Sequence, residues 1–277
     1  MKKIKLFFKI FAVLVITAVV YSFIEPYWVQ LKETDIVNND IPESFNNTRI
    51  LFVSDIHLGP LYSLNRLKNL VKRINRLKPD IILLGGDYVY KSPKYIEPCF
   101  NELKNLKSRL GVYGVLGNHD HWENAESVRQ NMKKAGIVLL DNNAEWININ
   151  NDRIKLGGVG DYWSDHQDLT PTVNDVKKED FVILLSHNPD YVDELKTDDV
   201  DLVLSGHTHG GQITFFGHMF PFALKTFNPK YRTGLIDTGR TKLLVSNGIG
   251  SVWSLPVRFC ARPQINIVNL KNSVSGS

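Results

Sequence analysis

The feature that most constrains this chain is a short apolar segment that ends in two closely spaced histidines. Residues 202–204 are all aliphatic, a Ser-Gly pair follows, and His207 and His209 are then separated by one residue. In an extended backbone, side chains two residues apart point to the same side, so both imidazoles can reach one point. Because neutral imidazole is the commonest metal ligand, the pattern predicts a metal site at the end of a buried strand. Two exposed loop histidines are the alternative.

Four other apolar segments end in the same way. They are predicted as buried strands by length and branching, at residues 50–53, 81–84, 112–116 and 181–185. The side chains that follow them are Asp55 and His57, then Asp87, then Asn118, His119 and Asp120, and finally His187. Helical spacing at 64–77 (with Ser63 as N-cap) and 95–107 predicts helices between the first three strands, as in α/β layers with largely parallel strands. Ligands of such sheets bind beyond the carboxyl ends of strands, so we expect one shared site.

The middle of the chain predicts a second sheet. Short apolar segments separated by turn residues favour a partly antiparallel arrangement, at 137–140, 145–149 and 154–158. Residues 160–178 lack a regular period and are expected to form a loop. Its aromatic side chains, among them Trp163, either line a substrate cleft or cover an edge of the core.

Charge and composition argue against a nucleic-acid-binding surface. The chain has 33 Lys and Arg against 29 Asp and Glu, but four of the basic residues precede the first acidic one: Lys2, Lys3, Lys5 and Lys9. Without these four, 29 basic residues face 29 acidic ones, and the remaining chain is neutral. Cys99 and Cys260 lie far apart with no C-x-x-C pattern, so neither is expected to bind a metal.

The N-terminus is predicted to be a membrane element. Residues 10–24 are an uncharged run of 15 residues, about 22 Å long as a helix and short of the roughly 30 Å hydrocarbon core. Extension back to Leu6 gives 19 residues, with Lys9 near enough to the end to reach the interface. An uncleaved anchor is favoured over a cleaved signal peptide, since no good A-x-A site follows. The preceding lysines place the N-terminus in the cytoplasm and the bulk of the chain outside.

The ordered motifs resemble the calcineurin-like metallophosphoesterase superfamily. The matching blocks are Asp55-x-His57, Gly86-Asp87, Gly117-Asn118-His119-Asp120, His187 and Gly206-His207-x-His209, within a resemblance over about residues 49–270. The resemblance implies an α/β fold, a layered αββα sandwich of two mixed β-sheets flanked by helices. In chain order we expect a basic cytoplasmic segment at 1–9, a transmembrane anchor at 10–24, a polar linker at 25–48, the metallophosphoesterase domain at 49–271 and a tail at 272–277.

The resemblance also implies a centre with two divalent metal ions. One ion would be held by Asp55, His57, Asp87 and His209, and the second by Asp87, Asn118, His187 and His207, with Asp87 as the bridge. Mixed nitrogen and oxygen ligands suit Mn, Zn or Fe. Two such ions would polarise a phosphoryl group and activate water for in-line attack. His119 would lie beside the scissile phosphate, oriented by Asp120, and would bond a phosphoryl oxygen or protonate the leaving group.

These observations predict a membrane-anchored phosphoesterase that hydrolyses a phosphodiester or pyrophosphate bond in a lipid or cell-envelope substrate. The chain resembles a membrane-associated bacterial branch that includes UDP-2,3-diacylglucosamine pyrophosphatases and cell-wall-associated phosphodiesterases. Cleavage of a cell-wall polymer is therefore an alternative, and an extracytoplasmic domain would not reach a cytosolic nucleotide-lipid. A non-catalytic metal-binding scaffold is a further alternative, against which the complete residue set, including His119, argues.

Overall fold

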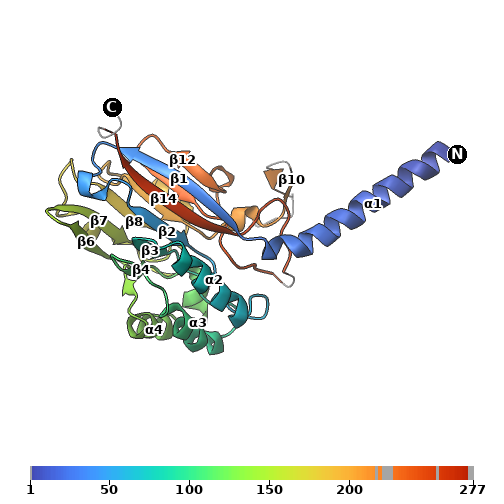
Figure 1. The fold of residues 1–277 in the computed structure, drawn as a ribbon, viewed down its shortest axis with the longest axis horizontal. Coiled ribbons are helices and arrows are strands. Elements are labelled where there is room, and N and C mark those ends of the chain that lie inside the picture. The colour runs from blue at the N-terminus through green and yellow to red at the C-terminus, as the bar shows by residue number, and fades with distance from the viewer. Residues whose placement is uncertain (1, 216–217, 220–226, 254–255, 274–277) are drawn as a thin grey trace.

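Two six-stranded mixed β-sheets pack against each other and form the body of the protein (Figure 1). The computed structural model describes residues 2–215, 218–219, 227–253 and 256–273. Helices cover the outer face of the first sheet, and short helical segments and loops cover that of the second. The expected α/β fold with two mixed sheets flanked by helices is confirmed.

The first sheet has the strand order β1-β14-β2-β3-β4-β5. Its strands are β1 Gln30–Asn38, β14 Gln264–Asn272, β2 Arg49–Val53, β3 Ile81–Leu84, β4 Val112–Gly114 and β5 Val138–Leu139. Strands β2 to β5 run parallel, β14 is antiparallel to β2, and β1 is parallel to β14. The carboxyl ends of β2, β3 and β4 therefore lie along one edge of the sheet.

The second sheet has the strand order β12-β13-β9-β8-β7-β6. Its strands are β12 Gly234–Asp237, β13 Lys242–Val245, β9 Leu202–Ser205, β8 Val182–Leu185, β7 Asp152–Gly158 and β6 Asn143–Ile149. The four central strands run parallel, whereas β12 and β6 are antiparallel to their neighbours, as a partly antiparallel sheet requires. A separate two-stranded hairpin joins β10 Thr214–Phe215 to β11 His218–Met219.

Three helices pack on the first sheet, and the remaining helical segments of the body are short. The three are α2 Leu64–Arg76, α3 Ile96–Leu103 and α4 Asn118–Lys134. The side chain of Ser63 accepts a hydrogen bond from the backbone N–H of Arg66, as expected for the N-cap of α2. The short segments are η1 Glu25–Tyr27, η2 Glu43–Phe45, η3 Pro93–Tyr95, α5 Thr170–Val173, η4 Pro189–Glu194, η5 His209–Gly211 and η6 Pro229–Tyr231.

Alternating side chains of the strands divide between two apolar cores. In β2, Ile50 and Phe52 pack between the sheets, whereas Leu51 and Val53 pack against the helices. Leu204 of β9 reaches the same inter-sheet core from the second sheet. Each such aliphatic side chain stabilises the fold by about 1.5–3 kcal/mol when fully buried. This shared core fixes the two sheets with the loops after β2, β3, β8 and β9 near one another.

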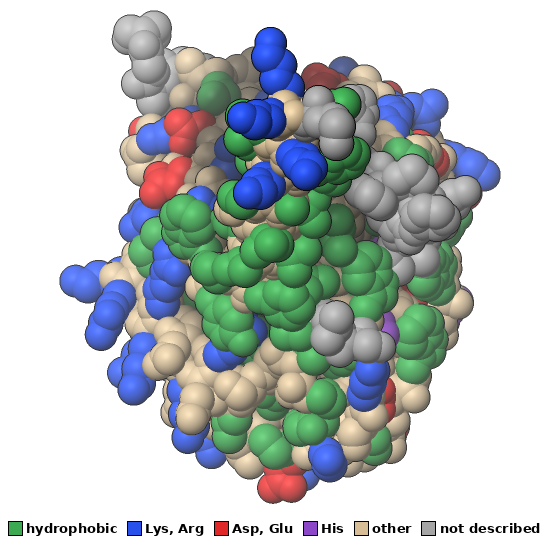
Figure 2. All heavy atoms as spheres, turned by 90° about the vertical axis from the view of Figure 1, so that its right-hand side faces the viewer, with side chains coloured by type: hydrophobic (Ala, Val, Ile, Leu, Met, Phe, Trp, Pro, Cys, Tyr) green, Lys and Arg blue, Asp and Glu red, His purple; other side chains and the backbone are tan. Residues whose placement is uncertain are grey.

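Helix α1, Lys2–Ile24, projects away from the body and buries none of its residues (Figure 1). It is long and apolar enough to cross a membrane. Figure 2 looks onto the side from which α1 projects and shows hydrophobic side chains gathered in the middle of this view. The exposed hydrophobic residues continue past the helix to Tyr27 and Trp28, a pair of aromatics typical of a membrane interface.

Residues 25–48 differ from the expected polar linker, because they contain β1. This strand pairs along its whole length with β14, from Gln30 opposite Gln264 to Asn38 opposite Asn272. Ile36, beside β14, is buried in the inter-sheet core. The strand is not apparent in the sequence because it lies at the sheet edge, where most of its side chains are exposed and polar. The body therefore begins before Arg49; of the expected tail, residues 274–277 lie outside the described residues.

Candidate metal centre

Loops that follow the carboxyl ends of β2, β3, β4, β8 and β9 meet at one place. They bring together Asp55, His57, Asp87, Asn118, His187, His207 and His209, all of them buried. The approach is close enough to require glycine: a Cβ atom on Gly206 would lie 1.7 Å from Oγ of Ser54. All seven metal-ligand candidates named from the sequence therefore share one site.

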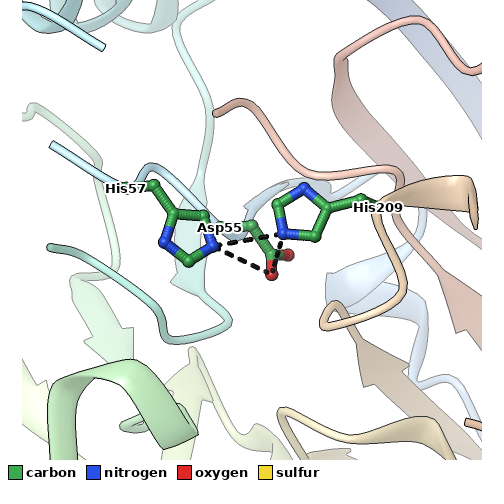
Figure 3. A group of neighbouring side chains, drawn as sticks. All are labelled: Asp55, His57 and His209. Carbon is green, nitrogen blue, oxygen red and sulfur yellow. Dashed lines mark hydrogen bonds and ion pairs between the residues drawn. The ribbon is translucent and has the colours of Figure 1, made fainter. Parts of the chain in front are cut away.

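Asp55, His57 and His209 form the first group of this site (Figure 3). Nε2 of His57 lies 3.1 Å from Nε2 of His209, and Oδ1 of Asp55 lies 3.9 Å and 3.5 Å from these two nitrogens. Figure 3 shows the polar atoms of the three side chains turned toward one another. Two imidazole nitrogens that face each other beside a carboxylate are a suitable donor set for a divalent ion.

Asp87 joins the first group to a second one. Its Oδ2 lies 3.4 Å from Nε2 of His57 and 3.3 Å from Nε2 of His187. Nδ1 of His187 is 2.6 Å from the carbonyl oxygen of Gly85, to which it donates. This hydrogen bond orients the ring with Nε2 toward Asp87, an arrangement usual for metal-binding histidines. The carboxylate of Asp87 is thus placed between the two groups, where a bridging ligand would lie.

His207 and Asn118 complete the second group, since Nδ1 of His207 lies 3.0 Å from Oδ1 of Asn118. The rings of His207 and His187 are 5.2 Å apart. The two histidines of the Gly-His-x-His motif therefore belong to different groups, because His209 lies with Asp55. The argument that an extended backbone brings both imidazoles to one point was wrong: the φ angles of His207 and His209 are 66° and 50°.

Left-handed backbone is a shared property of five ligand candidates. Their φ angles are 53° at Asp55, 50° at His57, 56° at Asp87, 66° at His207 and 50° at His209. Such conformations cost residues other than glycine about 1–3 kcal/mol each and occur mainly at functional sites. The cores on both sides of the strands hold these loops in place.

The protonation states of the buried groups fit metal binding. Burial lowers the pKa of His57 to about 3 and that of His209 well below its usual value, so both rings are neutral at pH 7. Burial opposes ionisation of Asp87, but His187 holds its pKa well below the usual range. Burial also opposes protonation of His187, yet Asp87 raises its pKa well above the usual value. Each of the two groups thus favours the charged form of the other, and a bound metal ion would compensate the carboxylate in place of His187.

His119 lies at the rim of the centre and is half-buried. Its ring centroid is 4.8 Å from that of His57 and 4.6 Å from that of Trp122. Its backbone N–H donates to Oδ1 of Asp87 at 2.9 Å. The side chain is thus beside the metal-ligand groups and faces the open side of the site.

Asp120 has partners other than the expected one. Its Oδ2 accepts hydrogen bonds from the backbone N–H groups of Asp87 (2.8 Å) and Gly117 (3.0 Å), and its Oδ1 from that of Tyr88 (2.9 Å). These contacts tie the loop after β3 to the start of α4. The hydrogen bonds of the Asp120 carboxylate in the described residues thus go to backbone N–H groups and not to the ring of His119.

A cleft of about 220 Å³ opens above the two groups. Its base contains Asp87, Asn118, His119, His207 and His209, and its walls are Tyr90, Trp122, Trp163, Val252 and Trp253. Trp163 packs edge-on against His207 with 4.4 Å between ring centroids, whereas Trp122 packs against His119. The side chain of Trp163 is 44% exposed and that of Trp122 is 60% exposed, so both can contact a ligand. Of the two roles open for Trp163, the structure favours the cleft wall.

Arg258 is a contributor that the sequence did not reveal. It is fully buried, and its Nη2 lies 3.2 Å from Nδ1 of His209. Its only sequence signal is a single basic residue in a partly apolar segment, which is too common to be informative. Cys99 and Cys260 are both free thiols, and neither is among the metal-ligand groups found in the described residues.

Two mixed sheets with histidine and aspartate groups at their strand ends, joined by one carboxylate, define the class of hydrolases that use two metal ions. Residues 48–211 match the family model for calcineurin-like phosphoesterases. The chain belongs to this family and is a metallophosphoesterase.

Several similar proteins match a longer part of this chain than the family model does. The uncharacterized metallophosphoesterase YkuE of Bacillus subtilis is 32% identical over 262 residues, which cover 91% of this chain and 88% of YkuE. Phosphodiesterase YaeI of Escherichia coli is 32% identical over 226 residues, 80% of this chain and 82% of YaeI. A transmembrane protein with metallophosphoesterase domain from Danio rerio is 30% identical over 256 residues, 87% of this chain but 57% of that protein.

Proposed function

We propose that this metallophosphoesterase is anchored in a membrane and cleaves a phosphodiester or pyrophosphate bond in a lipid or cell-envelope substrate. The observation that carries the proposal is the short path from α1 to the metal centre. Arg258, whose guanidinium contacts His209, also donates its backbone N–H to the carbonyl oxygen of Ser22 in α1 at 3.0 Å. One residue therefore spans the distance between the apolar helix and a metal-ligand candidate. A substrate held in the same membrane would lie near the cleft.

The walls of the cleft support a substrate with an apolar or ring-bearing group next to its phosphate. Trp163 packs on His207 of the second metal-ligand group, Trp122 packs on His119, and Trp253 lies in the same cleft. Aromatic rings contribute about 0.5–1.5 kcal/mol per ring contact beyond the area that they bury. The similarity to a protein named phosphodiesterase, YaeI, supports a diester as the reacting group.

The chain's own residues would divide the chemistry among them. Two divalent ions bound by the two groups would supply the positive charge that an anionic phosphoryl group requires. His119, at the base of the cleft, would donate a hydrogen bond to a phosphoryl oxygen or protonate the leaving group. Asp120 would keep His119 in place by fixing the backbone on both sides of it. Asn118 and His207 would hold the second ion on the far side of Asp87.

An uncleaved anchor with the body outside the cytoplasm is part of the proposal. The last turn of α1 is docked on the body, with the rings of Tyr21 and Phe259 5.6 Å apart, which favours an anchor that is retained. Four lysines in the first nine residues favour a cytoplasmic N-terminus. Protease added to spheroplasts is expected to digest the body; complete protection of the body until the cells are lysed would indicate the opposite orientation.

The first test is hydrolysis of bis-p-nitrophenyl phosphate by the full chain in detergent micelles with Mn. The full chain is needed because a fragment that starts at Arg49 would lack β1. Turnover that requires both metal and His119 would support the proposal. A folded chain that holds two ions per molecule and turns over neither this diester nor a pyrophosphate would favour the scaffold alternative.

The second test distinguishes the two substrate classes. The active chain, reconstituted in vesicles, would be given a lipid-linked pyrophosphate and, separately, a phosphodiester-linked wall polymer. The apolar helix and the aromatic walls of the cleft favour the lipid, which would be one exposed outside the cytoplasm and not a cytosolic nucleotide-lipid. Faster cleavage of the polymer than of the lipid would favour the cell-wall alternative, and would agree with a body that lies outside the cytoplasm.

A further inference from the structure

The membrane-proximal end of α1 is joined to the body through one short segment, residues 258–262. The backbone N–H of Arg258 donates to the carbonyl oxygen of Ser22 at 3.0 Å. The backbone N–H groups of Cys260 and Ala261 donate to the two carboxylate oxygens of Glu25, at 2.8 Å and 2.6 Å. Figure 1 shows α1 meeting the body beside the chain that leads into β14. Glu25 is completely buried, so this contact is part of the packed body.

The side chain of Arg258 runs from this junction to the metal centre. Its Nη2 lies 3.2 Å from Nδ1 of His209, and its Nη1 is 3.4 Å from the carbonyl oxygen of the same residue. The guanidinium also donates to the carbonyl oxygens of Ala261 and Gly250, at 2.7 Å from Nη1 and 3.2 Å from Nε. Since a guanidinium has donors only and a planar shape, these acceptors fix its orientation. The fixed guanidinium holds the backbone of His209 through the carbonyl oxygen of that residue. It lies beside Nδ1 of the ring but is not its hydrogen-bond partner when a metal is bound, because a guanidinium only donates and a neutral imidazole that binds a metal through Nε2 carries its proton on Nδ1.

The same guanidinium supports the other two members of the first group through Gly250. The backbone N–H of Gly250 donates to the carbonyl oxygen of Asp55 at 2.6 Å. Gly250 also lies directly against His57, because a Cβ atom added to it would be 2.9 Å from Cβ of that residue. Arg258 therefore contacts the backbone that lies behind Asp55 and His57 as well as His209 itself.

We propose that Arg258 is a positioning residue for the Asp55–His57–His209 metal site, and that the end of α1 sets its position through Ser22 and Glu25. The metal affinity of this site then depends on the contact between the end of α1 and the body. Helix α1 therefore contributes to metal binding as well as to membrane attachment. The proposal rests on the metal centre of the proposed function. It is tested by metal binding, so it can fail while hydrolysis by the wild-type chain holds.

The test compares Mn binding by four full-length chains in detergent micelles: wild type, Arg258→Met, Glu25→Gln and Arg262→Met. Met matches the length of an arginine stem without its donors. Arg262 is the control, because it lies in the same segment and contacts Trp28, by its Nε to the carbonyl oxygen at 3.1 Å and by its guanidinium over the ring. Supporting contacts of metal ligands typically change affinity about 10–100-fold. We expect Arg258→Met to weaken one of the two Mn sites by that factor, Glu25→Gln by about tenfold, and Arg262→Met to bind as the wild type does.

Each result bears on the proposal. Near-ultraviolet circular dichroism of each chain shows whether it is folded, and elemental analysis after dialysis counts its ions. A folded Arg258→Met chain that binds both ions with wild-type affinity would overturn the positioning role, and equal weakening by Arg262→Met would overturn its specificity. Wild-type binding by Glu25→Gln would overturn the link to α1. If Arg258→Met does not fold, Glu25→Gln decides the question alone, since its tenfold loss of affinity is expected only if the junction sets the site.

Discussion

Replacement of Asp120 by asparagine tests how the loops of the metal centre are held. The carboxylate of Asp120 is fully buried and accepts three backbone hydrogen bonds, two at Oδ2 and one at Oδ1. Asparagine has the same shape but only one oxygen. If that oxygen replaces Oδ2, the amide NH₂ faces the N–H of Tyr88; if it replaces Oδ1, the NH₂ faces the N–H groups of Asp87 and Gly117.

The expected cost follows from this count. At least one buried backbone N–H loses its acceptor. Burial and the neighbouring Asp87 raise the pKa of Asp120 well above its usual value, so the cost is taken from the lost acceptor and not from a carboxylate charge. A buried donor left without a partner costs about 1–3 kcal/mol, and we expect Asp120→Asn to lower the free energy of unfolding by that amount. In the orientation that keeps two of the three hydrogen bonds, the released donor belongs to Tyr88, next to Asp87, so Asp87 is also expected to shift.

The assay is urea unfolding of the metal-free chain in micelles, so that the free energy of metal binding does not contribute. Asp198→Asn is the matched control, because Asp198 is 83% exposed and makes only a 3.9 Å ion pair with Arg240. Its replacement should change the free energy of unfolding by less than about 0.5 kcal/mol. An Asp120→Asn chain as stable as this control, with both metal ions bound at wild-type affinity, would refute the argument from backbone donors.

Four further predictions concern the site itself. His119→Ala should retain both metal ions and lose at least about a hundredfold in turnover; near-normal turnover of the metal-loaded variant would remove its proposed role. Asp87→Asn should lower the number of ions per chain in elemental analysis, because it removes the shared carboxylate. Trp163→Ala should raise KM about 2–10-fold for a diester with an apolar group, from a ring contact of about 0.5–1.5 kcal/mol, while a diester without that group serves as the unaffected control. Chelation should lower the free energy of unfolding by about 2.7 kcal/mol for each ion removed, relative to Mn at a hundred times the Kd of that site; a urea midpoint independent of Mn concentration would contradict this.

The ligand candidates could be found from the sequence because each follows a strand that is easy to recognise. Strands β2, β3, β8 and β9 each consist mainly of a short apolar run, and such runs indicate buried parallel strands. The residues after them have little choice of position, since the strand ends converge along one side of the two sheets. In such a fold, the candidate site residues are therefore easier to identify from the sequence than the contacts that support them.

What the sequence could not provide depends on contacts between distant segments. The family resemblance implied that His207 and His209 belong to different groups, but their spacing alone did not, because the separation results from left-handed φ angles that neighbouring residue types do not predict. The polar edge strand β1 is stabilised by its pairing with β14, more than two hundred residues away. Arg258 acquires its place only when the end of α1, the loop at Gly250 and His209 are assembled around it.

These features depend on contacts between distant segments for one physical reason, and the same reason accounts for the metal centre lying close to α1. Strained loops and buried charges persist only where the surrounding structure offsets their cost. At the first metal-ligand group, part of that structure is the segment 258–262, which is held on its other side by Ser22 and Glu25. The N-terminal helix and the β1 segment that follows it are therefore needed to assemble the site. A version of this chain trimmed to the residues that carry the family motifs would keep every metal-ligand candidate and lose the contacts that hold Arg258, so it is expected to bind metal more weakly than the whole chain.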